Sequence, residues 1–236
     1  MKKKICLVIV AYPGKLTKIR NLIDNNQNLN LLVFFNNFKK KPILKNINEC
    51  FYFNTSITIS RIEMIKILKK LNYDYYIFHD VDDKYNKKRP NLIKKYFNKY
   101  DFVINDIKTI YKNKYFSTRI KNKQILNFKL IKNYNFAGMT NSACSRNILK
   151  KIKFYKTDYK APIFDWMFWR KIFKKGNGIF VNETISFYDV NKKSATFLPT
   201  NFQNKNNLKI GLKIRKYFGL KGKSYMVNQN NFWWEV

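Results

Sequence analysis

Three of the chain's 14 acidic residues lie within four positions, directly after a segment with the composition of a buried strand. Tyr75 to Phe78 is aromatic and β-branched, and Asp80, Asp82 and Asp83 follow it. Clustered carboxylates repel one another unless a cation lies between them, and Mg²⁺ or Mn²⁺ held by one or two carboxylates normally also binds a substrate phosphate. The cluster therefore predicts a site for a divalent metal and a diphosphate. The alternative is a solvated acidic turn.

A second group of candidate residues lies in the other half of the chain. The segment from 162 to 170 has an apolar helical pattern that carries one carboxylate, Asp165, and one guanidinium, Arg170. Asp165 is a candidate catalytic group, and the alternative is that it stabilises the start of the helix. The run from 135 to 143, which includes Gly138 and Met139, is small and polar and suits close approach to a ligand; the alternative is an ordinary loop.

Composition limits the classes of protein to which the chain can belong. With 236 residues, 45% hydrophobic, it can form a substantial core, and its formal charge of +34 suits a polyanionic partner: nucleic acid, an anionic membrane or phosphorylated substrates. An AT-rich genome would also produce many lysines. A single histidine argues against Ser-His-Asp and Cys-His mechanisms, and three cysteines without metal-binding spacing indicate a reducing compartment, hence a cytoplasmic protein.

The pattern along the chain predicts strands that alternate with helices. Strands are expected at 5–11, 31–35, 51–53, 75–78, 102–104 and 179–181, and helices at 16–23, 60–71, 90–99 and 145–151, with the second helix capped by Ser60 and Glu63. This order predicts an α/β fold with a mainly parallel sheet, in which ligands bind beyond the carboxyl ends of the strands. Tyr12, Asn36 and Asp80 should meet there. No glycine-rich dinucleotide or P-loop motif is present.

These segments together resemble the GT-A glycosyltransferases, especially the inverting family 2 enzymes. The resemblance rests on the first strand and its turn, the pattern Asn54, Ser56, Ser60, Arg61, the segment YYIFHDVDD, and the segments FAGMTNSACSRNILKKI and FDWMFWRKIFKKGNGIFVNETISFYDV. It covers roughly residues 4 to 197. It implies a Rossmann-like mixed sheet flanked by helices over 1–200, followed by a basic C-terminal tail at 201–236.

The resemblance also implies roles for individual residues. Asp165 would be the general base for the acceptor hydroxyl, and Asp82 with Asp80 would hold Mn²⁺ or Mg²⁺. The donor, a nucleoside diphosphate sugar with UDP favoured, would contact Ala11, Tyr12, Pro13, Asn36, Arg61, Asp80, Asp82 and Asp83. The acceptor side would be formed by Gly138, Met139, Trp166 and Arg170.

The sequence departs from the family pattern at three points. Asn36-Asn37 replaces an acidic residue that meets the base, Phe164-Asp165 replaces paired acids, and no histidine is found near Tyr188. The implied function is metal-dependent transfer of a sugar, with inversion, to a glycan or lipid-linked acceptor. The alternative from another class is a basic nucleic-acid-binding protein or metal-dependent nuclease.

The C-terminal tail carries seven basic residues and one acidic residue, together with Phe232-Trp233-Trp234. Ile210, Ile214, Tyr217 and Phe218 would lie on one helical face. This combination predicts peripheral binding to an anionic membrane surface, on the cytoplasmic face. The alternative is a helix packed on the core.

Overall fold

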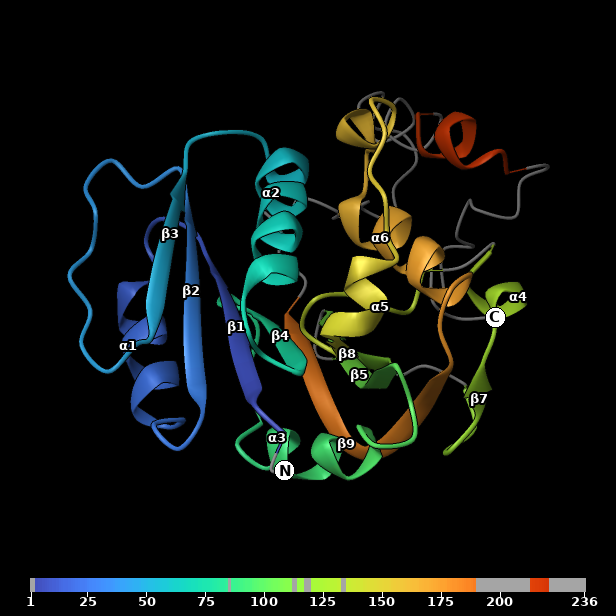
Figure 1. Cartoon of the computed structure of the whole chain (residues 1–236), viewed down its shortest axis with the longest axis horizontal. Helices are drawn as coiled ribbons and strands as arrows, with labels where there is room; N and C mark the ends of the chain where they lie inside the picture. Colours follow the sequence, from blue (N-terminus) through green and yellow to red (C-terminus); the bar gives the residue numbers. More distant parts are fainter. Residues whose placement is uncertain are drawn as a thin grey trace.

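A computed structural model describes residues 3–84, 86–111, 114–116, 120–132, 135–189 and 213–220. These residues form a three-layer α/β/α fold, with one mixed sheet between two groups of helices (Figure 1). The strands are β1 Ile5–Ala11, β2 Asn30–Asn36, β3 Glu49–Phe53, β4 Tyr75–Asp80, β5 Phe102–Tyr111, β6 Lys114–Phe116, β7 Ile125–Leu126, β8 Ser142–Ser145 and β9 Gly178–Asp189. The helices are α1 Leu16–Asp24, α2 Ile57–Lys70, α3 Arg89–Ile93, α4 Phe128–Lys132, α5 Arg146–Lys150 and α6 Phe164–Phe173, with a further helix over 213–218.

The sheet is buried on both faces because successive residues of its central strands alternate between two apolar clusters. In β1, Val8 and Val10 face α2, α5 and α6, whereas Leu7 and Ile9 face α1 and the segment from α3 to Tyr100. This double coverage explains why β1, β2 and β4 are almost continuously apolar in sequence. All three strands predicted from that composition are confirmed.

The strand order is β3-β2-β1-β4-β8-β5-β9-β7, and β6 pairs with β5. Strands β1 to β4 pair in parallel, and so do β5 and β9, whereas β8 runs antiparallel to both β4 and β5. Because β1 lies between β2 and β4, the chain passes from β1 to β2 and β3 on one side and then crosses to β4 on the other side of β1. The crevice beyond β1 and β4 is therefore where this class of sheet binds ligands.

A buried arginine holds together the region where the sheet changes from parallel to antiparallel. The Arg89 guanidinium donates to the Asn105 side chain at 2.7 Å and to the carbonyl oxygens of Phe78 and Ser142 at 2.8 Å each. It thereby joins β4, β5 and β8 from within the core. Three hydrogen-bond acceptors compensate for the loss of water around the charge.

Several predicted elements differ in their boundaries. The predicted cap of α2 is wrong: the helix begins one turn earlier, where the Ser56 hydroxyl accepts from the Ile59 amide at 3.3 Å. Ser60 instead donates to the Ile57 carbonyl, and Glu63 pairs with Lys66. The predicted helix at 90–99 divides into α3 and a 3₁₀ turn over Lys94–Tyr96. The small-residue run at 135–143 contributes to β8, an antiparallel strand that the sequence did not predict.

Part of the C-terminal tail packs on the core. Ile214 and Phe218 are buried, and the ring of Phe218 lies 4.3 Å from that of Trp166 in α6. The packed-helix alternative therefore describes residues 213–220, while 201–212 and 221–236, including Phe232-Trp233-Trp234, lie outside the described residues. No helix in the described ranges has both the length and the apolar composition needed to cross a bilayer.

Candidate functional site

The carboxyl ends of β1 and β4 bring the first predicted residues together. The two strands pair with Val10 opposite Asp80, so Tyr12, just beyond β1, lies beside the end of β4. Burial raises the pKa of Tyr12 to about 12, which keeps its hydroxyl protonated at neutral pH. The predicted meeting of Tyr12 and Asp80 at this edge is therefore observed.

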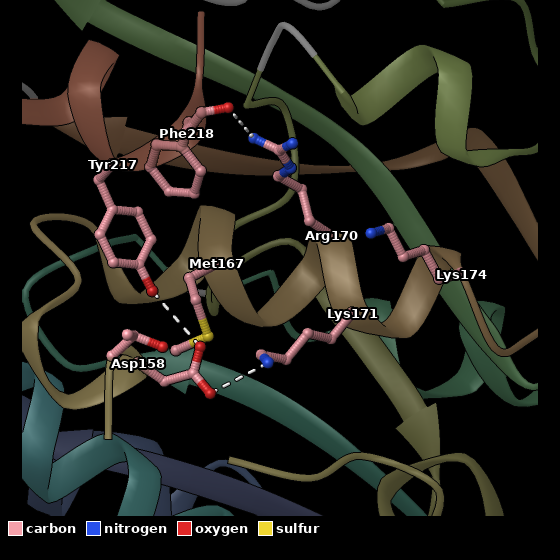
Figure 2. Close-up of a pocket in the computed structure, with 8 residues that line it drawn as sticks. Asp158, Met167, Arg170, Lys171, Lys174, Tyr217 and Phe218 are labelled. Carbon is pink, nitrogen blue, oxygen red and sulfur yellow. Dashed lines mark hydrogen bonds and ion pairs between the residues drawn. The ribbon is translucent and has the colours of Figure 1, made fainter. Parts of the chain in front are cut away.

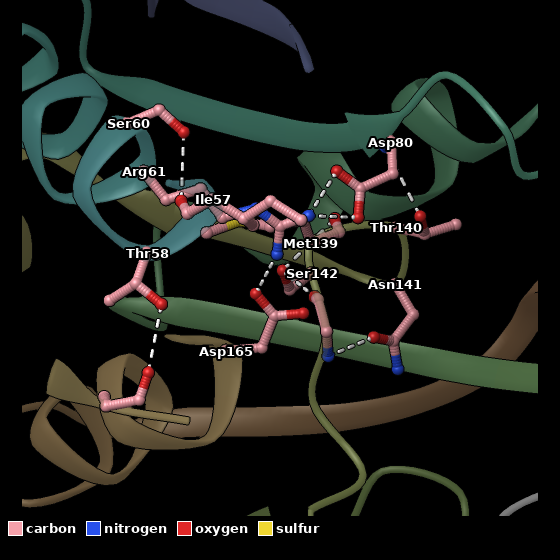
Figure 3. A network of polar contacts seen from close by, with 12 residues as sticks. Ile57, Thr58, Ser60, Arg61, Asp80, Met139, Thr140, Asn141, Ser142 and Asp165 are labelled. Carbon is pink, nitrogen blue, oxygen red and sulfur yellow. Dashed lines mark hydrogen bonds and ion pairs between the residues drawn. The ribbon is translucent and has the colours of Figure 1, made fainter. Parts of the chain in front are cut away.

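Arg61 of α2 is the centre of the site, because its guanidinium joins Asp80 at the end of β4 to Asp165 at the start of α6 (Figure 3). Its Nη2 donates to both oxygens of Asp80, at 2.8 and 2.9 Å, and to the Tyr12 hydroxyl at 3.2 Å. Its Nη1 donates to Oδ1 of Asp165, at the start of α6. The side chains of Arg61, Asp80 and Asp165 are only 10%, 14% and 20% exposed. Asp165, which lies 104 positions from Arg61 in sequence, and Asp80, which lies 19 positions from it, are thus fixed within one ion-pair network.

The site holds more carboxylates than cations. Burial raises the pKa of Asp80 to about 7 against the opposing effect of Arg61, with Asp165 and Asp82 raising it further. Burial also raises the pKa of Asp83 well above its usual range, and Asp80 and Asp82 contribute to the rise. Burial acts to lower the pKa of the Arg61 guanidinium, but the carboxylates of Asp165 and Asp80 raise it well above its usual value. Arg61 therefore remains a cation. A further positive charge would relieve this mutual repulsion.

The remaining residues of the acidic cluster face different surroundings. Asp83 is buried and accepts a hydrogen bond from the Thr140 hydroxyl, which also accepts from the Asp80 amide at 3.3 Å. Asp82 is exposed, and its carbonyl accepts from Lys18 of α1 at 2.9 Å. Sequence reasoning missed Lys18 and Thr140. Lys18 is one of many lysines, and the position of Thr140 depends on β8, which the sequence did not predict.

Asp165 does not cap its helix. The N-cap of α6 is Ile163, which makes no side-chain cap hydrogen bond, and the Asp165 carboxylate instead pairs with Arg61 through Oδ1. The other oxygen, Oδ2, has no hydrogen-bond partner among the described residues and faces Gly138, where an added Cβ would lie 3.6 Å from it. The Gly138 amide is held by Asn141 Oδ1 at 2.7 Å. The predicted acceptor-side segment therefore lies beside Asp165.

The side chains of four other predicted residues make no hydrogen bond or ion pair with this network in the described part of the chain. Trp166 is fully buried and donates its indole N–H to the Ile131 carbonyl at 2.8 Å. Arg170 points to the opposite side of α6, where it donates to the Phe218 carbonyl at 3.3 Å. Met139 is buried in the core.

Asn36 uses its amide within the protein, donating to the Thr55 carbonyl and accepting from the Thr55 amide. Ala11 is buried at the end of β1, and Pro13 is exposed in the turn after it.

The carboxylates after β4 are the expected ligands of a divalent metal. Within the described residues, no group of three or more His, Cys, Asp or Glu side chains is arranged to hold a metal ion by itself. Mg²⁺ and Mn²⁺ bound with a nucleotide need fewer protein ligands, because one or two carboxylates suffice when phosphate oxygens complete the shell. The exposed carboxylate of Asp82, the adjacent Asp80 and the excess of negative charge fit such a shared site.

Comparison with known proteins identifies the fold. The sequence matches no protein-family profile and no curated protein. Among solved structures, it is similar to residues 1–349 of Staphylococcus aureus TarS, a GT-A-type glycosyltransferase, at a TM-score of 0.61 and 12% identity over 90% of this chain and 65% of that one. The same TarS fragment in complex with UDP-GlcNAc gives a TM-score of 0.62 and 13% identity, covering 90% and 66% of the two chains.

A longer TarS structure gives a TM-score of 0.60 at 13% identity, and the match covers 95% of this chain but only 46% of TarS. This chain therefore spans less than two thirds of each TarS structure. At such low identity the comparisons establish the architecture alone. They confirm the GT-A fold that the sequence resemblance implied.

Proposed function

We propose that the protein is a glycosyltransferase that moves a sugar from a nucleoside diphosphate sugar to a hydroxyl group of an acceptor. The observation that carries this proposal is the Arg61 network, which joins Asp80 at the donor end of the sheet to Asp165 at the start of α6. The GT-A architecture supports it. The UDP-GlcNAc complex of the structurally similar TarS favours a UDP-sugar as the donor class.

The donor would lie beyond the carboxyl ends of β1 and β4. Tyr12 and the end of β1 would line the nucleotide. Lys18, which donates to the Asp82 carbonyl, and Arg61, which pairs with Asp80, would supply positive charge to a diphosphate placed against Asp82. A divalent metal held by Asp82 and Asp80 would offset the negative charge that develops on the leaving diphosphate. Arg61 would then remain the fixed cation that joins the donor side of the site to Asp165.

Asp165 is the proposed general base. Arg61 holds its Oδ1, and this contact fixes the carboxylate so that Oδ2 faces the segment around Gly138. An acceptor hydroxyl entering beside Gly138 would donate its proton to Oδ2 while its oxygen attacks the anomeric carbon. The diphosphate leaves with the electron pair of the broken C–O bond. Direct displacement of this kind inverts the configuration at that carbon.

The proposed acceptor is a class of molecule, a glycan or a lipid-linked glycan, rather than a single compound. Either would approach Asp165 from the side of Gly138, whose amide is held by the buried Asn141. A cytoplasmic protein that attaches peripherally to an anionic membrane would meet a lipid-linked acceptor at the surface. The charge of +34 is consistent with that attachment.

Thermal unfolding tests the proposed donor class. We expect a UDP-sugar with Mn²⁺ to raise the melting temperature, since a ligand at 100 times its Kd stabilises the native state by about 2.7 kcal/mol, or roughly 5–10 °C for a chain of this size. The same sugar nucleotide in EDTA, and ADP- and GDP-sugars with Mn²⁺, are the controls. If no nucleoside diphosphate sugar moves the melting temperature with or without metal, the proposed function is wrong.

A further inference from the structure

A pocket lies on the side of α6 that faces away from Asp165. It has a volume of about 440 Å³ and is lined by Thr157, Asp158, Met167, Arg170, Lys171, Lys174, Tyr217 and Phe218. In a helix of 3.6 residues per turn, Arg170 and Lys174 are rotated by about 140° and 180° from Asp165. The pocket is therefore separate from the Arg61 network, and the proposed transfer reaction uses none of its residues.

Three basic side chains from the end of α6 line one wall, and the 213–218 helix forms the other (Figure 2). Lys171 is neutralised by the buried Asp158, at 3.0 Å. Asp158 also accepts from the Tyr217 hydroxyl at 3.4 Å, which ties the two walls together. Arg170 and Lys174 have no carboxylate partner in the described part of the chain, so the pocket carries two uncompensated positive charges.

These two cations are held in place by aromatic rings. The Arg170 guanidinium lies 5.1 Å from the centre of the Phe218 ring and donates to the Phe218 carbonyl, and Lys174 lies 4.6 Å from the centre of the Phe128 ring. Partial burial lowers the pKa of Arg170, which means that the charge has lost water without gaining an anion. A bound anion would compensate for that loss.

We propose that this pocket binds a phosphate group. A phosphate dianion balances both free charges and accepts hydrogen bonds from Arg170 and Lys174, whereas a single carboxylate would leave one charge unbalanced. The volume exceeds that of a phosphate alone, and Met167, Tyr217 and Phe218 supply an apolar wall for the body of the ligand. The phosphate could belong to a soluble sugar phosphate or to a lipid headgroup, since both present the same oxygens.

Calorimetry with matched charge variants tests this site. Inorganic phosphate is titrated into the full chain without nucleotide or divalent metal, so the result does not depend on the proposed transferase function. We expect saturable binding that weakens about 5- to 10-fold in Lys174→Gln and at least tenfold in Arg170→Gln. Lys175→Gln removes the same charge from the next, exposed residue, which does not line the pocket, and should bind as the wild type does.

Two further ligands identify the source of the phosphate. Displacement of inorganic phosphate by glucose 1-phosphate indicates a soluble ligand. Binding to phosphatidylcholine vesicles only when they contain phosphatidate, with loss in Lys174→Gln, indicates a lipid headgroup. The proposal is overturned if phosphate binding does not saturate, if both pocket variants bind normally, or if Lys175→Gln weakens binding as much as Lys174→Gln. Should Arg170→Gln fail to fold, the exposed Lys174 decides the outcome alone.

Discussion

At the scale of single residues, Arg61 organises the candidate site, because one buried cation is shared by two carboxylates. Its contact with Oδ1 of Asp165 leaves Oδ2 as the oxygen that faces Gly138. A carboxylate fixed at one oxygen and open at the other is prepared for proton transfer without reorientation. The role of Asp165 can therefore be separated from its contribution to the fold.

Asp165→Asn should abolish most of the transfer while leaving the donor site intact. The amide keeps the shape of the side chain but cannot accept the acceptor's proton, so turnover should fall by about 10²–10⁴-fold. Affinity for the donor should change little, since the contacts of Arg61 with Asp80 and Tyr12 remain. Single-turnover transfer and donor binding are measured on the same preparation.

Glu63→Gln is the control for Asp165→Asn, because it also removes one carboxylate but lies in a half-exposed pair with Lys66. It should transfer sugar at the wild-type rate. If Asp165→Asn shows near-normal turnover per folded molecule, Asp165 is not the base and the proposed mechanism fails.

Asp82→Asn should remove the metal dependence of donor binding with little effect on folding. Asp82 is exposed, and only its backbone carbonyl has a described hydrogen bond, so its carboxylate contributes little to packing. Calorimetry with UDP and Mn²⁺ should show affinity close to that measured in EDTA. Asp74→Asn, an exposed carboxylate at the other end of β4, is the matched control. Unchanged metal-dependent affinity in Asp82→Asn would reject the metal assignment.

His79 should make the protein sensitive to acid. Burial lowers the pKa of His79 to about 3, and Arg89 lowers it further, whereas an unfolded histidine titrates near 6.5. The unfolded state therefore binds more protons between these values, and the stability contributed by neutral His79 is complete above about pH 6.5 and is lost as pH falls toward 3. A tenfold difference in proton affinity corresponds to about 1.4 kcal/mol.

His79→Gln provides the comparison, because glutamine cannot take up the proton. The difference in unfolding free energy between the wild type and this variant should shrink steadily from pH 7 to pH 4, measured by urea denaturation. A difference that stays constant over this range would mean that His79 is protonated equally in both states.

At the scale of elements, the sequence predicts what depends on local pattern. The strands β1, β2 and β4 are recognisable because burial on both faces requires continuous apolar residues, and the position of Asp80 and Tyr12 at their ends follows from the parallel arrangement. Strand β8 is not recognisable, since SACS has no strong strand preference and pairs with β4 and β5 only in the folded sheet. Thr140 was missed for that reason.

The sequence also did not show which side of α6 each of its polar side chains lies on. Asp165 and Arg170 are near each other in sequence, and both were assigned to the site, but helical rotation places them on different sides. Which side of α6 faces the Arg61 network depends on how the helix packs against α2 and against residues 213–220. Both packing arrangements are tertiary contacts.

Gly178→Ala should destabilise the junction of β5 and β9. A Cβ at Gly178 would lie 2.1 Å from the ring of Phe102, which is fully buried and cannot move away. We expect a loss of about 1–3 kcal/mol or more in the free energy of unfolding. Gly138→Ala is the control, because its nearest contacts would be an ordinary 3.6 Å. Equal stability of the two variants would show that β9 can shift to accept the methyl group.

At the scale of the whole molecule, the charge of +34 fits several partners, and they differ in how many phosphates they bring to the protein. Nucleic-acid binding would draw on many lysines acting on many phosphates, whereas a sugar nucleotide at the candidate donor site would bring a single diphosphate to a few cations such as Lys18 and Arg61. A polyanion could still bind elsewhere on the surface. The two modes of binding differ in their response to salt.

Raising the salt concentration from 50 to 200 mM should therefore weaken the binding of generic duplex DNA far more than that of a UDP-sugar with Mn²⁺. Contacts with six to ten phosphates release as many counterions, and this lowers affinity by about 10³–10⁵-fold, whereas a single buried diphosphate site is screened much less. Fluorescence anisotropy of labelled DNA and calorimetry of the sugar nucleotide, in the same buffers, measure both. DNA affinity that persists at 200 mM, together with no binding of sugar nucleotides, would favour the nucleic-acid-binding alternative over a transferase.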